Sequence, residues 1–372
     1  MKVLLLEMGG EALQQRYLLG IDIGTSSCKI ALFSADGETV FQDTQSYSII
    51  YERPGYAEQD PEAWWEAVRA GIQRMFSETK LNAKQIVGIG IDGQSGAMIP
   101  VDRSGTPLRN AMLWLDRRSE AQYATLQQTI GEQKIFAISG NPLSSSYVTG
   151  KVLWMKEHEP DIFSQTFKVL QSNSFIVSKL TEAFTQDHSQ GNGFHCYNIA
   201  TNSWDYDLAE QMRLPGELLP DIYACSDVVG TVTSQASAAT GLAVGTPVVA
   251  GGLDAACATL GAGAIWPGET QEQGGQAGGM SIVMDKPLGN EKLILSAHVV
   301  PDKWILQGGT VGGGSLNWLK REFGDLLQAD FFTLANESVA NIPPGSDGLV
   351  YLPYMAGERS PIWDPSAKGA FI

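Results

Sequence analysis

The segment 248–263 places the strongest constraint on what this chain can fold into. It reads Val-Val-Ala-Gly-Gly-Leu-Asp-Ala-Ala-Cys-Ala-Thr-Leu-Gly-Ala-Gly, an apolar start predicting a strand and a small-residue stretch predicting a helix. Gly251 and Gly252 at the junction let another molecule approach the backbone closely, and the start of a helix favours negative charge nearby. Asp254 could therefore accept a proton beside a phosphate, or it could simply cap the helix. The segment alone leaves both interpretations open.

The overall composition narrows the classes of protein that this chain can belong to. A length of 372 residues predicts two domains, and 43% hydrophobic with 18% charged residues is typical of a globular protein. With 25 basic and 41 acidic residues the net charge is -16, which argues against nucleic-acid or anionic-membrane partners. Any phosphate site must then act locally, through backbone N–H groups, helix ends and a metal ion. The apolar runs are too short for a membrane span.

The cysteines, the histidines and the first residues give further expectations. The four cysteines, Cys28, Cys196, Cys225 and Cys257, show no paired spacing, which fits a reduced cytoplasmic setting. The four histidines form no zinc-binding pattern, and the stretch from His188 to His195 predicts a surface loop. Residues 1–16 contain too short an apolar run for a signal peptide and are expected to lie outside the fold.

The first half of the chain alternates strands and helices. Residues 18–23 and 28–33 predict two strands around a polar glycine turn, and Asp36-Gly37 predicts a hairpin into a third strand near 39–41. Asp60 and Pro61 predict a helix start followed by an apolar stripe of Trp64, Trp65, Val68, Ile72 and Phe76. Further elements are expected at 86–91 as a strand and at 119–130, 150–158 and 174–180 as helices.

The pattern restarts near Gly245, which suggests a duplicated α/β fold with a cleft. A glycine-rich turn at 271–279 leads into a strand at 280–284, as the turn after Asp22 does earlier. A second glycine-rich loop at 310–318 opens a helix that continues to Phe323. The GxGxxG spacing at 88–93 is a poor dinucleotide fingerprint, because its glycines lie within the strand and no helix follows. Lys29, on a strand, is interpreted as a solvated side chain.

Four motifs in order give the chain a family resemblance. They are Asp22-Ile-Gly-Thr-Ser-Ser27, Trp114-Leu-Asp-Arg-Arg118, Gly251-Gly-Leu-Asp254 and Leu352-Pro-Tyr-Met-Ala-Gly-Glu-Arg-Ser-Pro361. With these motifs the chain resembles the FGGY family of carbohydrate kinases, most closely its xylulose-kinase branch, from Tyr17 to the last residue. The resemblance implies a duplicated α/β fold of the actin-like, ribonuclease H-like type (sugar kinase/Hsp70/actin), with two domains around a cleft. It implies a sugar-binding domain at 17–246 and a nucleotide-binding domain at 247–372.

The resemblance also implies ATP and Mg²⁺ as cofactors, with phosphorylation of a sugar hydroxyl. Asp254 matches the family's catalytic base, and Asp22 matches the acid that holds the metal through water. Substrate binding is implied for Gln94, Ser95, Gly96, Trp114, Asp116, Arg118 and Asp254. Cofactor binding is implied for Gly24, Thr25, Ser26, Gly275, Gln276, Gly278, Gly312, Gly313 and Gly314.

The sequence departs from the family pattern at three places in the motifs. Ser95-Gly96 stands where xylulose kinases usually carry Met-His, and Gln276-Ala277 replaces a Thr-Ser pair in the second phosphate turn. Ala255 stands where Asn or Gln often contacts the sugar. These departures point to a related but different polyol or keto-sugar, or to a weakened enzyme.

The chain also ends at Ile372, just after a motif that the family follows with a long further segment. That segment completes the second domain and supplies a glycine-rich adenine-binding motif. The sequence is either a piece of a longer chain or a shortened relative, and on this ground we expect it to bind sugar but to bind ATP weakly. The apolar surface so exposed would favour association, and a homodimer stays open.

Three functional hypotheses follow from these features. The first is an ATP-dependent kinase acting on a ketopentose such as xylulose. The second is a kinase of the same family for ribulose, gluconate or a signalling sugar, which the Ser95-Gly96 change supports. The third is a non-catalytic sugar-binding relative. Retention of both Asp22 and Asp254 argues against the third, because a binding protein needs neither acid.

Overall fold

The computed structural model describes residues 16–274, 277–324, 330–355, 357–358, 360–364 and 366–372. The chain divides into two compact units, each assembled from three segments. The first unit comprises Met1–Leu113, Glu159–Asp187 and Glu217–Asp254, and the second comprises Trp114–His158, His188–Gly216 and Ala255–Ile372. Because the units interleave along the sequence, the division at residues 246 and 247 stays a prediction.

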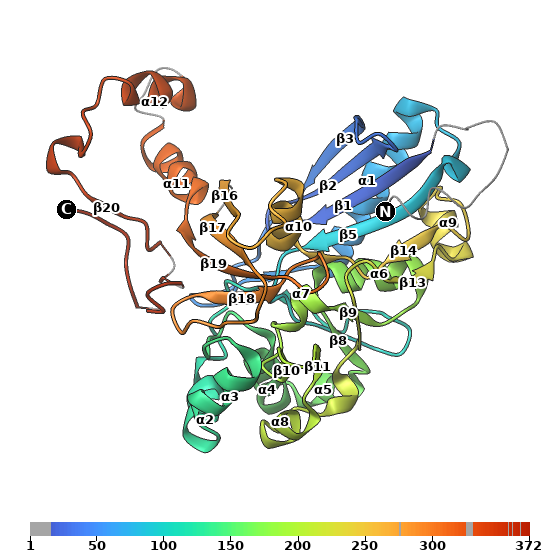
Figure 1. Cartoon of the computed structure of the whole chain (residues 1–372), viewed down its shortest axis with the longest axis horizontal. Coiled ribbons are helices and arrows are strands. Elements are labelled where there is room, and N and C mark those ends of the chain that lie inside the picture. Colours follow the sequence, from blue (N-terminus) through green and yellow to red (C-terminus); the bar gives the residue numbers. More distant parts are fainter. Residues whose placement is uncertain (1–15, 275–276, 325–329, 356, 359, 365) are drawn as a thin grey trace. The chain divides into compact units, whose positions relative to one another are not determined.

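The first unit is built on a mixed β-sheet. Its strands run in the order β13-β14-β5-β1-β2-β3, and β15 also pairs with β5. The members are β1 (Tyr17–Ile23), β2 (Ser27–Ser34), β3 (Thr39–Ser46), β5 (Ile86–Gly93), β13 (Val228–Thr231), β14 (Pro247–Val249) and β15 (Gly252–Leu253). Strands β1, β2 and β3 are antiparallel, whereas β5 is parallel to β1, β14 and β15. Figure 1 shows β3, β2, β1 and β5 side by side.

Helix α1 (Pro61–Thr79) covers β2 and β3. Asp60 caps it by accepting a hydrogen bond from the Glu62 N–H, and Pro61 occupies the first turn, as predicted. The buried face differs from the predicted stripe at one position, since Met75 is fully buried and Phe76 is only half-buried. The remaining buried side chains of the stripe are Trp64, Trp65, Val68 and Ile72.

Shorter elements complete the first unit. They are β4 (Glu58–Gln59), β6 (Ile99–Val101), β7 (Ala111–Met112), α5 (Pro160–Gln165), β8 (Lys168–Leu170), α6 (Ser172–Thr181), β9 (Thr185–Asp187), β12 (Asp221–Tyr223) and α9 (Ser234–Thr240). Helix α6 was expected at 174–180, and of its two extra residues at the start, Ser172 bonds to the Gln94 carbonyl oxygen and Asn173 to the Ala250 carbonyl oxygen.

The second unit carries an antiparallel sheet in the order β16-β17-β19-β18. Its strands are β16 (Thr270–Gly274), β17 (Ala277–Met284), β18 (Ile294–Ala297) and β19 (Trp304–Val311). Strands β16 and β17 form a hairpin across residues 275–276, as β1 and β2 do across Gly24–Ser26. The repeated hairpin agrees with the duplicated fold that the sequence suggests.

Further helices and short strands belong to the second unit. They are α2 (Glu120–Thr129), α3 (Glu132–Ser139), α4 (Val148–His158), α7 (His188–Gly191), β10 (Tyr197–Asn198), β11 (Ser203–Trp204), α8 (Tyr206–Gln211), α10 (Asp254–Gly261), α11 (Gly313–Phe323), α12 (Phe331–Val339), β20 (Tyr351–Leu352) and β21 (Ala370–Phe371). Within the described part of the chain, none of these helices combines the length and apolar character needed to cross a membrane.

The surface loop predicted for His188 to His195 is wrong. His188 starts the short helix α7, and His195 is completely buried, with T-shaped contacts to Tyr123 and Tyr147. The His195 Nε2 lies 3.1 Å from the Pro142 carbonyl oxygen, so this nitrogen carries the proton. The glycines and asparagine of the stretch indicated an exposed loop. His195 is buried instead, because the rings of Tyr123 and Tyr147 pack against it.

Burial of His195 predicts a loss of stability in acid. Burial lowers the pKa of His195 to about 4, and the hydrogen bond to Pro142 offsets only part of this effect. Because an unfolded histidine titrates near 6.5, the free energy of unfolding should fall by roughly 3 kcal/mol as the pH drops from 6.5 to 4. Denaturant titrations of the native protein and of His195→Phe across this range measure the difference. An equal loss of stability in both proteins would contradict the assignment.

Candidate active site

Three carboxylates meet at the ends of neighbouring strands in the first unit. Asp22 on β1 lies opposite Asp92 on the parallel strand β5, and Asp92 lies opposite Gly252 on β15. Two residues after Gly252, Asp254 begins α10. The carboxyl ends of adjacent strands in an α/β sheet are where such folds bind ligands. The structure therefore brings the two predicted catalytic acids, Asp22 and Asp254, to one place.

The glycine turn before Asp254 is shaped by the protein's own packing. Gly251 has φ +82°, and a Cβ built there would lie 1.9 Å from the Ile91 carbonyl oxygen. Only glycine permits this close crossing of β5, so Gly251 is explained without a ligand. Asp254 occupies the first turn of α10 itself and is half-buried. A carboxylate is stabilised at this end of a helix.

Asp92 is the functional candidate that the sequence reading missed. Burial raises the pKa of Asp92 well above the usual carboxyl range, and the charges of Asp22 and Asp254 and a hydrogen bond with Asp22 raise it further. It sits inside the glycine-spaced stretch that was set aside as a poor nucleotide fingerprint. The sequence does contain a signal for Asp92: it is an acid near the end of a second buried strand, at the position equivalent to Asp22 on the first.

The three acids create a strongly negative environment. The Lys29 Nζ lies 2.7 Å from Asp22 Oδ2, with 59% of the Lys29 side chain exposed. Burial would lower the pKa of Lys29, but the hydrogen bond to Asp22 and the charges of all three acids raise it overall. The predicted solvated Lys29 is thus also an ion-pair partner. Burial, with the charges of Asp22, Asp43 and Asp92, raises the pKa of the Cys28 thiol to about 12.

The turn at Gly24, Thr25 and Ser26 is held by hydrogen bonds to its backbone, and the Gly24 N–H itself donates to the Ser27 carbonyl oxygen at 3.1 Å. The carbonyl oxygen of Gly24 accepts from the Tyr47 hydroxyl at 2.6 Å, and that of Thr25 accepts from the Gln59 amide at 2.8 Å. In a trans peptide the N–H points away from the C=O, so the N–H groups of Thr25 and Ser26 point away from these supports. A turn of this kind suits an anionic group such as a phosphate.

The acids fit a magnesium ion held with phosphate and water. Among the described residues, Oδ1 of Asp22 is buried without a hydrogen-bond partner. In the described residues, no group of three His, Cys, Asp or Glu side chains is arranged to hold a metal ion by itself. Mg²⁺ typically takes one or two carboxylates and keeps several waters, completing its shell with substrate phosphate. The carboxylates at this site match that coordination preference of Mg²⁺.

The predicted sugar loop, Gln94–Gly96, follows β5 directly. The Gln94 Nε2 donates to the Gln59 Oε1 at 3.1 Å and to the Gly24 carbonyl oxygen at 3.4 Å, which ties this loop to the phosphate turn. Gly96 has φ +68° and donates its N–H to Gln171 Oε1 at 3.0 Å. Ser95 is half-buried between them.

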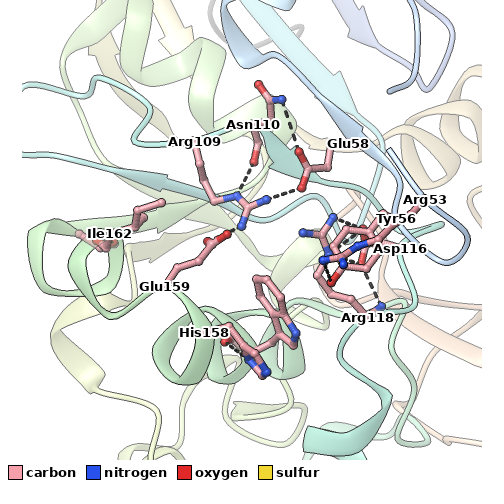
Figure 2. Close-up of polar contacts among 12 residues, drawn as sticks. Arg53, Tyr56, Glu58, Arg109, Asn110, Asp116, Arg118, His158, Glu159 and Ile162 are labelled. Atoms are coloured by element: carbon pink, nitrogen blue, oxygen red, sulfur yellow. Dashed lines mark hydrogen bonds and ion pairs between the residues drawn. The ribbon is translucent and has the colours of Figure 1, made fainter. Parts of the chain in front are cut away.

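A buried cluster of charges holds the strand that carries Gln59. The Arg109 guanidinium bonds to Glu58, the neighbour of Gln59 on β4, and also to Glu159 at the start of α5 (Figure 2). Asn110 donates to the other oxygen of Glu58 at 3.4 Å. With only 9% of its side chain exposed, Arg109 fixes β4 from two sides. Removing such a buried partner is costly.

The other predicted sugar residues lie in the second unit. Arg118 makes a two-pronged ion pair with Asp116 at 2.7–3.0 Å, and both side chains are almost completely buried (Figure 2). The Arg118 guanidinium also lies 5.0 Å above the Trp154 ring, which stacks on His158. Asp116 and Arg118 therefore form a local ion pair that is buried and does not lie on the surface. Trp114, at the start of the segment, is half-buried.

The predicted second phosphate turn is described only in part. Gly275 and Gln276 lie outside the described residues, and Gly278 is in β17, where a Cβ would lie 3.5 Å from the Gly312 Cα. Gly312 precedes α11, and Gly313 and Gly314 form its first turn instead of an extended loop. The structure thus places Gly278 beside a helix start that has no side-chain cap.

Comparison with known proteins agrees with this arrangement. The N-terminal domain of the FGGY family of carbohydrate kinases matches residues 17–261. The chain is 32% identical to a xylulose kinase of Bacillus subtilis, covering 96% of this chain and 71% of the relative. A gluconokinase of Bacillus subtilis is 27% identical over 96% of this chain and 71% of its own. The crystal structure of a xylulose kinase from Rhodospirillum rubrum superposes with TM-score 0.84 at 29% identity, covering 96% and 72%.

The fold and the paired acids define a sugar kinase with a duplicated actin-like, ribonuclease H-like fold. The chain belongs to the FGGY family of carbohydrate kinases.

Replacing Asp92 should stabilise the metal-free protein. Ionising a carboxyl whose pKa is raised on folding costs free energy of folding. The cost is absent below about pH 4, where aspartate is protonated in both states, and it grows as the pH rises through the folded-state pKa. In EDTA, Asp92→Asn should therefore melt at a higher temperature than the native protein at pH 7, with the gap closing toward pH 4.

Thermal melts across this pH range measure the effect of Asp92→Asn. The matched control is Asp36→Asn, at the exposed hairpin turn, where Asn-Gly serves as well as Asp-Gly. A neutral-pH melting temperature for Asp92→Asn at or below that of the native protein would show that the three carboxyls do not oppose folding.

Proposed function

We propose that this protein transfers a phosphoryl group from ATP to a hydroxyl of a ketopentose such as xylulose. The observation that carries the proposal is the convergence of Asp22 and Asp254 at adjacent strand ends. The xylulose kinases among the relatives and solved structures support the choice of substrate. Phosphoryl transfer needs alignment and charge neutralisation more than covalent help from the protein, and in this proposal bound Mg²⁺ would supply the neutralisation.

In this proposal Asp254 is the general base. Its half-buried carboxylate at the start of α10 accepts the proton of the attacking hydroxyl. Asp22 would hold Mg²⁺ through water, and Mg²⁺ bound there would neutralise charge on the phosphates. Lys29 steadies Asp22 from the exposed side.

The nucleotide phosphates would be bound by two glycine turns. In the first unit, the Gly24 N–H donates to the Ser27 carbonyl oxygen and closes the turn, whereas Thr25 and Ser26 would supply N–H groups. Gly275, Gln276 and Gly278 would do so in the second unit, and Gly312, Gly313 and Gly314 open the helix beside them. The start of an uncapped helix favours negative charge.

The sugar would be bound by Gln94, Ser95 and Gly96, together with Trp114, Asp116 and Arg118. The tight Asp116–Arg118 pair fixes the Trp114 segment, leaving the Trp114 ring as an apolar surface for the carbon face of the sugar. We place the enzyme in the cytoplasm, which the absence of a disulfide among its four described cysteines supports, and a homodimer is part of the proposal.

A specific observation favours a second substrate class. Ser95-Gly96 gives the sugar loop no ring donor, and a gluconokinase stands among the relatives at 27% identity. A sugar acid such as gluconate is therefore the alternative substrate. Coupled ADP-release assays with pentuloses, polyols and sugar acids separate the two, and a higher kcat/KM for gluconate than for every pentulose would replace xylulose.

Replacing the proposed base should abolish turnover and spare sugar binding. A positioned general base contributes roughly 10²–10⁴ in rate, so Asp254→Asn should lower kcat by at least a hundredfold with the sugar Kd little changed. Steady-state kinetics and titration calorimetry test the two halves, with Asp161→Asn on exposed α5 as the control. A loss in kcat of less than tenfold would remove Asp254 from the mechanism.

Truncating the proposed stacking surface should weaken sugar binding alone. Trp114→Ala should raise the sugar KM by about tenfold, equivalent to about 1.4 kcal/mol, and leave the KM for ATP unchanged. The control is Trp266→Ala, since Trp266 is 65% exposed in the same unit. An unchanged sugar KM, or a sugar-bound crystal structure with no contact at Trp114, would exclude this residue from the sugar site.

A further inference from the structure

A continuous series of buried hydrogen bonds joins the sugar loop to the turn that carries Asp254. It begins at Gly96, whose backbone N–H donates to Gln171 Oε1 at 3.0 Å. The Gln171 Nε2 then donates to Gln186 Oε1 at 3.1 Å, and the Gln186 Nε2 donates to Asp187 Oδ2 at 3.1 Å. These three side chains have no exposed surface.

A second series reaches Asp187 from the opposite end. Asn173 Nδ2 donates to Asp187 Oδ2 at 2.8 Å and to the Ala250 carbonyl oxygen at 3.4 Å. Ala250 directly precedes the Gly251-Gly252-Leu253-Asp254 turn. In addition, the Cys225 thiol lies 3.8 Å from Asp187 Oδ1, and the Cys225 carbonyl oxygen accepts the Gly251 N–H at 3.1 Å.

The backbone groups at the two ends fix the direction of every bond between them. Gly96 offers an N–H, so Gln171 must turn its amide oxygen toward Gly96 and its amide nitrogen toward Gln186. Gln186 must then turn its own oxygen toward Gln171 and its nitrogen toward Asp187. Ala250 offers a carbonyl oxygen, so Asn173 must present its amide nitrogen. Both series therefore arrive at residue 187 as donors. A buried residue that meets two donors must be an acceptor, because an unsatisfied buried N–H is expensive.

We propose that Asp187 is a positioning residue of the phosphoryl-transfer site, holding the sugar loop and the Asp254 turn at a fixed separation. The inference rests on the proposed function, which assigns Gln94–Gly96 to the sugar and Asp254 to proton transfer. Asp187 itself is buried and acts through Gln186, Gln171 and Asn173.

The start of α6 supports this role from a different contact. The Ser172 hydroxyl donates to the Gln94 carbonyl oxygen at 2.7 Å, and a Cβ built on Gly93 would lie 2.4 Å from that hydroxyl oxygen. The same helix turn thus contacts the sugar loop through Ser172 and the Asp254 turn through Asn173. Misplacing reacting groups by about 1 Å can cost on the order of a hundredfold in rate, so a rigid link of this kind has kinetic value.

The test breaks each series separately and compares sugar KM with kcat. Gln171→Leu removes the link to Gly96 and should raise the sugar KM by about tenfold with a smaller effect on kcat. Asn173→Leu removes the link to Ala250 and should lower kcat by about tenfold with a smaller effect on sugar KM. Asp187→Leu should do both, whereas Asp187→Asn, whose amide oxygen can still accept both donors, should stay within threefold of the native protein.

Amide hydrogen exchange supplies a readout that needs no turnover. Gln171→Leu should speed exchange in residues 94–98, Asn173→Leu should speed it in residues 250–254, and Asp187→Leu should speed it in both. The control is Thr240→Ala, which removes a buried hydroxyl of α9 that bonds to Ala236. It should lower stability without changing exchange in either segment or the sugar KM.

The outcomes separate the inference from the proposed function. If the native protein phosphorylates none of the sugars tested, the proposed function fails and hydrogen exchange alone decides on Asp187. Suppose that Gln171→Leu and Asn173→Leu fold and lower kcat only in proportion to the fraction of unfolded protein. If residues 94–98 and 250–254 also stay protected from hydrogen exchange in these variants, Asp187 has no positioning role. The inference would also be overturned if Asp187→Asn lost as much activity as Asp187→Leu. Accepting two hydrogen bonds would then not be what the site requires of residue 187.

Discussion

The candidate site depends on the parallel pairing of β1 with β5. That pairing, in register, sets Asp22 opposite Asp92, while β15 on the far side of β5 delivers Asp254. Alternate residues of the same strands, such as Ile21, Ile23 and Ile91, are buried in the core. A shift of one residue would expose those isoleucines and bury the acids. The hydrophobic core and the position of the acids are therefore one constraint, satisfied by a single register.

Bringing three carboxylates together works against folding and in favour of binding. Their mutual repulsion, together with burial, raises the pKa of Asp92, and Lys29 offsets part of the charge at Asp22. The remaining demand for positive charge is local, since the chain as a whole carries a net charge of -16. If the site binds Mg²⁺ as proposed, this unfavourable charge is a cost of function of the kind that proteins of marginal stability carry.

The order of elements could be predicted from the sequence because local chemistry determines it: Asp36-Gly37 made the hairpin, and Asp60-Pro61 began α1. The motifs around Asp22 and Asp254 were equally visible, and these acids do lie together. Asp92 was missed because its position beside Asp22 depends on the register between β1 and β5, which are distant in the sequence. The Asp187 network was missed because polar residues give no sign of burial until their partners are known. His195 was misplaced for the same reason.

The two units hold the backbone of the proposed binding sites by different physical means. In the first unit, directional hydrogen bonds through Asp187 set the separation of two loops, and an apolar filling could not do this because hydrophobic contact has no preferred direction. In the second unit sterics act instead: a Cβ on Gly309 would lie 2.4 Å from the Gly278 carbonyl oxygen, so β17 and β19 approach as bare backbone. A side chain on Gly309 is excluded there, and Gly278 lies beside Gly312 at the start of α11. Peptide N–H groups suit phosphate, because its recognition needs several hydrogen-bond donors more than close shape complementarity. A sugar needs loops that are held at defined distances from one another.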